Sequence, residues 1–431
     1  MKASQFNSFF FYEEKQIGYN AFTNEFLLLE PELYDLYNAA KHENNWKELQ
    51  TIHHDFHSFL VDKGFIVDEN DNEVEKVKDL VQKIDKDNDE LFELTINPTM
   101  NCNFKCWYCY ETHIKASKMS KETINNIISL VDNILIDKPN LKEFHLQWFG
   151  GEPLLYFDAT VVPLLKGIYP KMIERGIAFS SGFTSNGLLI NQNMLDVCKS
   201  LGVNHFQITL DGHRERHNQV RYVSKERGSY DEIVNNIKLC TKNEITTSAR
   251  INVSEETLDN LSKILDDFID LDDKSKEYLN FSFHEVWQEE KDIDSDIQNE
   301  VNLFRDHGLN TLYKGVNLDT VRSSCYADKK NHATINYNGE VFKCTARDFE
   351  SESREGLLNS NGVIEWNEKY ENRMNSKFKN APCLSCKILP ICNGGCSQQA
   401  IEHKGREYCV HGFDENKKLE VIKDKFLYAI S

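Results

Sequence analysis

The chain has 431 residues, a formal net charge of −19 at pH 7, 40% hydrophobic residues and 11% aromatic residues. This length predicts two to three domains with a large buried core, and the composition is that of a globular protein. The negative charge argues against a nucleic-acid partner, which would require a basic face. No apolar run follows a basic start and no stretch of 18 apolar residues occurs, so the sequence predicts a cytoplasmic protein that is not inserted into a membrane.

Residues 1–88 are expected to form a small separate α+β module. Short apolar runs at Phe6–Phe11 and Phe26–Leu29 flank a region that contains Gly18, which predicts two strands joined through a turn region. The other elements expected in this module are a helix after Pro31, a helix over Trp46–Val61 and a short strand at Phe65–Val67. This order of elements is winged-helix-like.

The stretch Cys102–Cys109 follows a strand-like run, Leu91–Asn97, that Pro98 ends. Its three cysteines, spaced C-x3-C-x2-C, are Cys102, Cys106 and Cys109. Three thiolates on so short a loop can hold three irons of a [4Fe–4S] cluster and leave the fourth iron open for a ligand that is not protein. A zinc site would need four ligands, with His113 as the close candidate, and this alternative stays open.

From Leu91 to about Val286, strand-like apolar runs alternate with amphipathic helices. After the first run, strands are expected at Phe144–Phe149, Ala178–Thr184, His205–Leu210, Ser248–Val253 and Phe281–Val286, with helices that include a Ser120-capped helix, Tyr230–Lys242 and Glu255–Asp270. About six βα units of this kind predict an α/β fold, a partial (β/α)6 parallel barrel. Functional groups should then lie at the carboxyl ends of the strands.

Polar, glycine-containing turns follow three consecutive predicted strands. They are Gly150-Gly151-Glu152-Pro153, Thr184-Ser185-Asn186-Gly187, and Thr209-Leu210-Asp211-Gly212 with His217 and Arg221 beyond it. Paired glycines allow a close approach of the backbone to a ligand, and a carboxylate such as that of Glu152 can bind an ammonium group. Each turn alone is ordinary, but their position in the domain that opens with the three cysteines predicts one shared binding site.

Residues 91 to about 290 resemble the core of radical S-adenosylmethionine (SAM) enzymes. The three cysteines match its cluster motif and Gly150–Pro153 its methionine-binding GGEP motif. The resemblance implies that SAM chelates the open iron, and that one electron, from a donor such as flavodoxin or ferredoxin, cleaves SAM to a 5′-deoxyadenosyl radical that abstracts a substrate hydrogen. The residues expected to contact SAM are Gly150, Gly151, Glu152, Ser185, Asn186, Thr209, Asp211 and Arg221.

Nine of the twelve cysteines lie outside the first motif. Cys198 and Cys240 fall in helix-like segments and are expected to be plain buried thiols. The remaining seven are Cys325, Cys344, Cys383, Cys386, Cys392, Cys396 and Cys409. The turn Asn338-Gly339 predicts a hairpin that would bring Cys325 and Cys344 together. Seven thiolates suit two further iron–sulfur clusters, with two zinc knuckles as the alternative.

The order of these seven cysteines resembles the SPASM extension of radical SAM enzymes. The resemblance implies one auxiliary cluster on Cys383, Cys386, Cys392 and Cys409, a second on Cys325, Cys344 and Cys396, and thus three [4Fe–4S] clusters in the chain. Some relatives carry an eighth cysteine before the position of Cys325, whereas the segment 317–324 has none. The second auxiliary cluster is therefore expected to be open at one iron or to take another ligand such as Ser323 or Ser324.

The sequence that follows Cys344 bears on the catalytic base. Anaerobic sulfatase maturases in this superfamily carry an aspartate directly after that cysteine, proposed as the base in formylglycine formation. This chain has Thr345-Ala346-Arg347-Asp348 at that place. The sequence therefore argues against a sulfatase maturase, although this interpretation stays open. Arg347 and Asp348 are the candidate catalytic residues.

The predicted domains are a precursor-peptide recognition element at 1–88, a radical SAM core at 89–315 and a SPASM domain with a carboxyl-terminal helix at 316–431. The first module resembles the elements that bind a leader peptide as an added strand on an open sheet edge, and its alternative is a structural cap. The sequence thus predicts a SPASM-type radical SAM maturase that installs a thioether or carbon–carbon crosslink in a ribosomal precursor peptide, recognised through leader and core. The alternatives are a sulfatase maturase and a non-catalytic metal-binding peptide scaffold.

Overall fold

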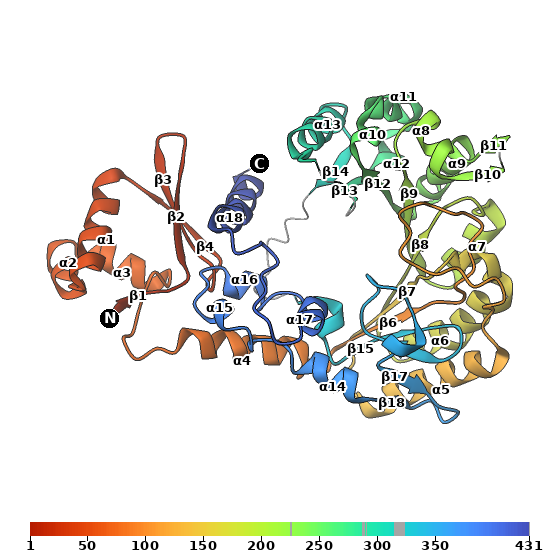
Figure 1. Ribbon diagram of the computed structural model, residues 1–431, viewed down its shortest axis with the longest axis horizontal. Coiled ribbons are helices and arrows are strands. Elements are labelled where there is room, and N and C mark those ends of the chain that lie inside the picture. Colours follow the sequence, from red (N-terminus) through yellow and green to blue (C-terminus); the bar gives the residue numbers. More distant parts are fainter. Residues whose placement is uncertain (225, 287–288, 290, 314–323, 431) are drawn as a thin grey trace. The chain divides into compact units, whose positions relative to one another are not determined.

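The computed structural model of the protein describes residues 1–224, 226–286, 289, 291–313 and 324–430 (Figure 1). Contacts divide them into two compact units. The terminal unit comprises 1–88, 324–330 and 369–430, and the barrel unit comprises 331–368 and the described part of 89–313. This division differs from the three predicted domains, because part of the predicted SPASM domain belongs to the barrel unit.

The barrel unit is built on an 11-stranded sheet in the order β14-β13-β12-β9-β8-β7-β6-β15-β16-β17-β18. Its parallel strands are β6 (Leu91–Ile96), β7 (Glu143–Trp148), β8 (Ala178–Ser185), β9 (Val203–Leu210), β12 (Thr246–Val253), β13 (Leu279–Glu285) and β14 (Asn310–Tyr313). The first six lie within two residues of the predicted strands, which confirms the parallel α/β fold. The short strand β14 was not predicted.

The other strands extend the sheet beyond β6. They are β15 (His332–Ile335), β16 (Glu340–Phe342), β17 (Gly356–Leu358) and β18 (Ile364–Trp366). β15 pairs with β6 in parallel, from His332 opposite Glu93 to Ile335 opposite Ile96, and this pairing holds residues 331–368 on the barrel unit. The predicted hairpin is confirmed, since β15 and β16 are antiparallel and Gly339 has a φ of +83°.

The helices of the barrel unit are α5 (Lys121–Asp137), α6 (Val162–Glu174), α7 (Gln192–Ser200), α8 (Arg214–Val220), α9 (Tyr230–Lys242), α10 (Glu255–Leu258), α11 (Ile264–Phe268), α12 (Asp273–Glu277) and α13 (Asp294–Asp306). A small ribbon, β10 (Tyr222–Ser224) with β11 (Arg227–Gly228), follows α8. Ser120 caps α5 as predicted, because its side chain accepts a hydrogen bond from the Thr123 N–H. The predicted helix over Glu255–Asp270 is wrong: it is broken after α10, where Asn260 adopts a left-handed φ of +60°.

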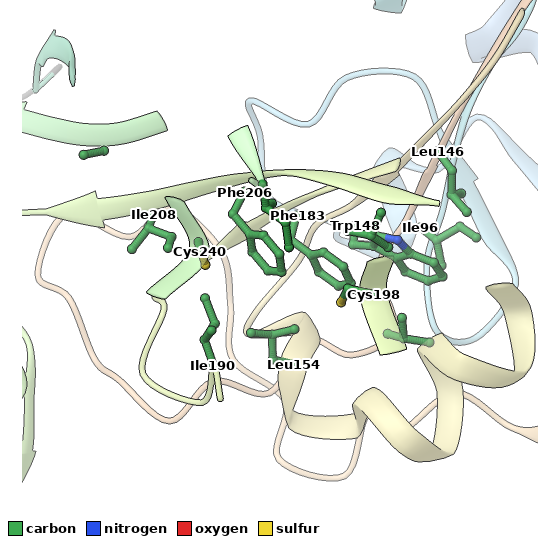
Figure 2. Close-up of a cluster of buried hydrophobic side chains, with 14 of the residues drawn as sticks. Ile96, Leu146, Trp148, Leu154, Phe183, Ile190, Cys198, Phe206, Ile208 and Cys240 are labelled. Carbon is green, nitrogen blue, oxygen red and sulfur yellow. The ribbon is translucent and has the colours of Figure 1, made fainter. Parts of the chain in front are cut away.

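One face of the parallel sheet packs against these helices and forms the main core. Figure 2 shows part of it, in which the rings of Trp148, Phe183 and Phe206 lie in a row. Neighbouring rings are stacked, with centroids 5.6 and 5.1 Å apart. Cys198 and Cys240 lie fully buried in the same core, which confirms both as plain buried thiols.

The terminal unit begins with an antiparallel sheet of three strands, β2 (Asn7–Tyr12), β3 (Lys15–Asn20) and β4 (Glu25–Leu29). The predicted strand pair with a turn region around Gly18 is therefore wrong, because Gly18 lies inside the middle strand. A Cβ atom at Gly18 would lie 2.9 Å from the ring of Phe9, so the glycine makes room for that aromatic side chain on the sheet. β1 (Lys2–Ala3) pairs separately with β5 (Ile66–Val67).

The helices of the terminal unit are α1 (Pro31–Glu43), α2 (Trp46–Ile52), α3 (His54–Asp62), α4 (Glu73–Asp85), α14 (Glu368–Met374), α15 (Ala381–Leu384), α16 (Leu389–Cys392), α17 (Ser397–His403) and α18 (Glu415–Ile430). The helix predicted over Trp46–Val61 is divided at His53, whose Nδ1 accepts a hydrogen bond from the Phe56 N–H and so caps α3. The order of strands and helices in residues 1–67 agrees with the predicted winged-helix-like pattern.

The amino-terminal sheet and the cysteine-rich segment share one core. Phe10, Ile17 and Tyr19 pack in a cluster with Ile388, Leu389, Ile391 and Ile422, and the ring of Phe426 on α18 lies 5.6 Å from that of Phe10. The first 88 residues are thus an integral part of the terminal unit. Within the described residues, no helix is long and apolar enough to cross a membrane.

Candidate active site

The cysteine loop after β6 borders a cavity of about 220 Å³ at the carboxyl ends of the strands. Cys102, Cys106 and Cys109 all line this cavity. Burial raises the pKa of the Cys102 thiol to about 12 and that of Cys109 to about 11, and the positive charge of Arg221 partly opposes both shifts. Thiols of this kind remain protonated until a bound metal centre compensates the thiolate charge. The structure therefore brings the three predicted cluster ligands to one cavity.

The two glycines after β7 allow close packing against the start of this loop. A Cβ atom on Gly151 would lie 2.2 Å from the carbonyl oxygen of Asn101, and one on Gly150 would lie 2.7 Å from the Cβ of Asn97. The next residue, Glu152, donates its N–H to the same Asn101 oxygen at 2.8 Å. The glycines thus bring the second strand end against the residues that lead into the cysteines, in addition to lining the cavity themselves.

The carboxylate of Glu152 is fully engaged by the protein. Its oxygens accept hydrogen bonds from the N–H groups of Leu154 (3.0 Å) and Asn186 (2.8 Å) and from the hydroxyl of Ser185 (2.9 Å). Burial raises the pKa of Glu152, and these donors oppose the shift. Glu152 is 1% exposed and does not line the cavity, so it positions Ser185 and Asn186 rather than meeting a ligand.

A buried polar network joins the cysteine loop to the ends of β9 and β12. The hydroxyl of Tyr108 donates to Asp211, whose carboxylate also accepts from Nε of Arg221 at 2.6 Å. Arg221 donates a second hydrogen bond to the Tyr108 oxygen (2.6 Å), and the side-chain amide of Asn252 donates to the same oxygen (3.0 Å). His217 also belongs to this network, because its Nδ1 accepts a hydrogen bond from the Asp211 N–H at 3.3 Å. The network fixes the Arg221 guanidinium at the cavity wall.

Most of the predicted SAM contacts lie at the cavity. Those that line it are Gly150, Gly151, Ser185, Asn186, Thr209 and Arg221. Glu152 and Asp211 do not line it but are hydrogen-bonded to residues that do. Thr184, from the second predicted turn, and His113, the candidate zinc ligand, also line the cavity. The cavity residues for which the sequence analysis predicted no role are Tyr108, Tyr110, Glu111, Phe149, Gln207, Arg250, Asn252, Glu285 and Val286. Gln207, Arg250 and Asn252 could have been found by counting back in steps of two from Asp211 and Ser254, the residues that directly follow β9 and β12, since side chains alternate between the two faces of a sheet.

Asp348 holds a neighbouring loop. Its two carboxylate oxygens accept hydrogen bonds from the Thr112 N–H (2.9 Å), the Thr112 hydroxyl (2.5 Å) and the Phe349 N–H (2.9 Å). Arg347 donates to the carbonyl oxygen of Ala346 at 2.7 Å. Neither candidate catalytic residue lines the cavity, and the contacts of Asp348 indicate a tether between the cysteine loop and the residues after β16.

Four cysteines of the terminal unit gather at a second cavity. Cys383, Cys386, Cys392 and Cys409 all line it, together with Tyr408 and Lys418. Burial raises the pKa of Cys392 to about 12, and the neighbouring thiols Cys383, Cys386 and Cys409 raise it further. These are the four ligands that the SPASM resemblance implied for one auxiliary cluster.

The other cysteine set is divided between the two units. Cys325 and Cys396 belong to the terminal unit and Cys344 to the barrel unit, so their common ligation stays a prediction. Residues 317–323, where an eighth cysteine is missing, lie outside the described residues. In the described part of the chain, no three His, Cys, Asp or Glu side chains are arranged to hold a single metal ion, although His113 Nε2 lies 3.7 Å from Cys109 Sγ.

Comparison with known families identifies the barrel unit. Residues 96–268 match the family model described as the radical SAM superfamily, a range that contains the cysteine loop, the glycine turn and the network around Asp211. Residues 96–268 are a radical SAM domain. Radical SAM domains bind a [4Fe–4S] cluster and SAM, and three thiols at one cavity with glycines beside them fit both groups.

One curated relative matches most of the chain. The radical SAM cyclopropyl synthase TigE of Paramaledivibacter caminithermalis is 23% identical over 404 residues, which cover 86% of this chain and 81% of TigE. The chain spans only 37–44% of the length of the four other curated relatives it matches. Those matches therefore cover less than half of each relative.

Two solved structures share the fold. Streptococcus suis SuiB bound to precursor peptide SuiA has a TM-score of 0.53 and 17% identity, and the match covers 94% of this chain and 98% of SuiB. Native anSMEcpe with bound AdoMet and Cp18Cys peptide has a TM-score of 0.55 and 19% identity, with 79% of this chain and 97% of that chain covered. The radical SAM domain thus lies in a chain whose fold is similar to that of SuiB over 94% of its length.

Proposed function

We propose that this chain is a radical SAM peptide maturase that installs a crosslink in a ribosomally made precursor peptide. The observation that carries the proposal is the single cavity lined by Cys102, Cys106, Cys109, the Gly150-Gly151 turn and Arg221. A scaffold that only binds peptides would have no use for such a site. The new bond is a thioether in the first instance, with a carbon–carbon bond as the second candidate.

The residues of this cavity have separate roles in the proposed reaction. Cys102, Cys106 and Cys109 would hold the cluster, and Ser185, Asn186 and Arg221 would orient SAM beside it. When bound, these two groups supply a 5′-deoxyadenosyl radical for hydrogen abstraction. Glu152 fixes Ser185 and Asn186 by hydrogen bonds, and Asp211 and Tyr108 fix Arg221. The role of the protein is thus to hold the reacting groups in one orientation.

Two auxiliary [4Fe–4S] clusters are part of the proposal. The first would use Cys383, Cys386, Cys392 and Cys409, and their gathering at one cavity supports this set. The second would use Cys325, Cys344 and Cys396, with one iron open or bound by another group. A small electron carrier such as flavodoxin or ferredoxin would supply electrons to the domain.

The amino-terminal module would recognise the leader part of the precursor. Both outer strands of its sheet, β2 and β4, have a free edge among the described residues, and an extended peptide can add to such an edge. The likeness to SuiB includes this module, since it covers 94% of the chain, whereas the likeness to anSMEcpe covers 79%. This difference favours a precursor-peptide maturase over a sulfatase maturase.

The proposal is tested by incubating the anaerobically reconstituted protein with SAM, a reductant and a candidate precursor peptide encoded near its gene. A maturase should lower the mass of the peptide by about two hydrogens for each crosslink formed while SAM is cleaved. A sulfatase maturase would instead convert a cysteine or serine in a sulfatase-derived peptide to formylglycine. Cleavage of SAM with conversion of that peptide alone would overturn the proposed substrate class.

A further inference from the structure

Arg250 lines the barrel cavity. Its guanidinium group forms no ion pair with a carboxylate among the described residues. Its Nε donates to Oδ1 of Asn252 at 2.9 Å, and in the described part of the chain its two terminal nitrogens have no hydrogen-bond or ion-pair partner. Arg221, which lines the same cavity, is bound to Asp211 and Tyr108. The two terminal nitrogens of Arg250 therefore form a planar donor fork that remains available to a ligand.

Arg250 lies farther from the cysteine loop than Asn252 does, and next to Thr209, one of the residues expected to contact SAM. It lies on β12, opposite Thr209 of β9 and Ser282 of β13, and two residues before Asn252. Because side chains alternate along a strand, Arg250 and Asn252 point to the same inner face, with Arg250 farther from the carboxyl ends where the cysteine loop lies. Arg250 thus occupies a deeper level of the cavity than the network around Asp211.

Two further polar side chains lie on the strands next to β12, within two residues of the positions that pair with Arg250. Gln207 on β9 lines the cavity, and its side-chain amide has no hydrogen-bond partner among the described residues. His284 on β13 bonds through Nε2 to the hydroxyl of Ser282 at 2.8 Å. Burial and the charge of Arg250 lower the pKa of His284 to about 4, so the imidazole is neutral at pH 7 and adds no positive charge beside Arg250.

Burial lowers the pKa of Arg250, because a half-buried cation without a directly bonded counter-ion is unfavourable. The charge of Asp211 opposes this shift, but Asp211 itself is ion-paired with Arg221. An anion bound at the fork would relieve this cost. Carboxylates match the planar fork with two parallel hydrogen bonds, and a glutamine amide can add a third donor. The chain carries a net charge of −19, so an unpaired arginine at this depth is not part of a general basic surface.

We propose that Arg250 and Gln207 form a carboxylate subsite that binds the side chain of a glutamate or aspartate in the substrate peptide, close to the residue that is modified. The inference rests on the proposed peptide substrate and adds to it the chemical class of one residue. The carboxylate of SAM is the other anion that could reach such a fork, and the experiment separates the two.

The test measures peptide binding to the SAM-loaded, anaerobically reconstituted full-length protein. The probes are the capped tripeptides acetyl-Gly-Glu-Gly-amide and acetyl-Gly-Gln-Gly-amide, titrated by ligand-observed NMR. The protein should prefer the glutamate peptide by about tenfold or more, and Arg250→Gln should reduce that preference to within about twofold. Arg250→Lys, which keeps the charge but not the fork, should retain an intermediate preference.

The matched control is Arg227→Gln, because Arg227 is exposed and pairs with Glu232 away from the cavity. It should keep the preference of the unaltered protein. Equal binding of the two peptides by the unaltered protein would overturn the proposal. So would an Arg250→Gln variant that keeps the glutamate preference, or one that changes only the affinity for SAM. Failure of reductive SAM cleavage would instead refute the proposed function, since peptide binding does not require turnover.

Discussion

The hydroxyl oxygen of Tyr108 lies 2.7 Å from Oδ1 of Asp211, which joins the cysteine loop to the end of β9. Tyr108 stands directly before the last cysteine of the loop, and Asp211 is 103 positions farther along the chain. Through Asp211 the contact reaches Arg221, the guanidinium whose charge acts on all three cysteine thiols. The position of the loop and the position of this charge are therefore set by one network.

Asp211→Asn should destabilise the barrel unit and weaken SAM binding. Asp211 is 1% exposed and Arg221 8% exposed, so the variant would leave a buried guanidinium without its counter-charge. Breaking a buried pair in this way costs about 3 kcal/mol. The free energy of unfolding from denaturant titration checks this value, and a SAM titration checks the binding. The control is Asp231→Asn, which removes an exposed partner of Arg214 and should cost less than about 1 kcal/mol.

Gly151→Ala should reduce iron binding at the cysteine loop more than it reduces the stability of the fold. The added methyl group would lie 2.2 Å from the Asn101 oxygen and would push the residues before Cys102 away from the strand end. We expect the iron content after anaerobic reconstitution to fall by about a third, the share of one cluster in three. Gly176→Ala is the matched control, because Gly176 also has a positive φ (+66°) but open space around its Cβ position. An unchanged iron content in Gly151→Ala would contradict this account of the turn.

Much of this site follows from local sequence, and the remainder depends on long-range pairing. The cysteine spacing, the glycine turn and the six strands could be predicted because each is a short pattern with one local cause. The role of Glu152 could not, since it depends on the N–H of Asn186 and the hydroxyl of Ser185, which the pairing of β8 with β7 brings into reach. A carboxylate beside glycines has the same local pattern whether it binds a ligand or the protein itself.

Two differences between the predicted and the observed organisation have related causes. Gly18 has the local character of a turn residue, but the ring of Phe9 needs the space that a side chain at this position would fill. Residues 331–368, which the sequence analysis placed in the carboxyl-terminal domain, group with the barrel unit because β15 adds to β6, a strand more than 200 residues earlier in the chain. Apolar alternation predicts that a strand exists, but it does not predict its partner.

The protein should lose stability in mild acid because of the buried imidazole of His217. Burial lowers the pKa of this imidazole to about 3, so the folded protein keeps it neutral while the unfolded chain protonates it below its ordinary pKa of about 6.5. The contribution of His217 to the free energy of unfolding is then complete above that pH. It is lost as the pH falls, by up to about 1.4 kcal/mol per pH unit. Unfolding free energies between pH 7 and pH 5 should fall less steeply for His217→Gln. The exposed His54→Gln should match the unaltered protein, and parallel slopes for all three would contradict the prediction.

Peptide recognition by the amino-terminal sheet can be tested without deleting it. Deletion of residues 1–88 would expose the core shared with Ile388, Leu389 and Ile422, so point variants are more informative. Leu28 on β4 and Phe11 on β2 are exposed on the two outer strands, and lysine on an outer strand discourages added pairing. We expect Leu28→Lys or Phe11→Lys to weaken precursor binding about tenfold, with SAM cleavage retained. Unchanged binding in both variants would favour the structural-cap interpretation.

Reductive cleavage of SAM by the protein in which Cys102, Cys106 and Cys109 are all replaced by alanine tests the central claim most directly. The unaltered protein should bind on the order of twelve irons per chain and release 5′-deoxyadenosine when reduced in the presence of SAM. The triple variant should keep about two thirds of the iron, held by the other cysteines, and release no 5′-deoxyadenosine. Release of 5′-deoxyadenosine by the triple variant at the rate of the unaltered protein would contradict the assignment of this loop as the cluster site.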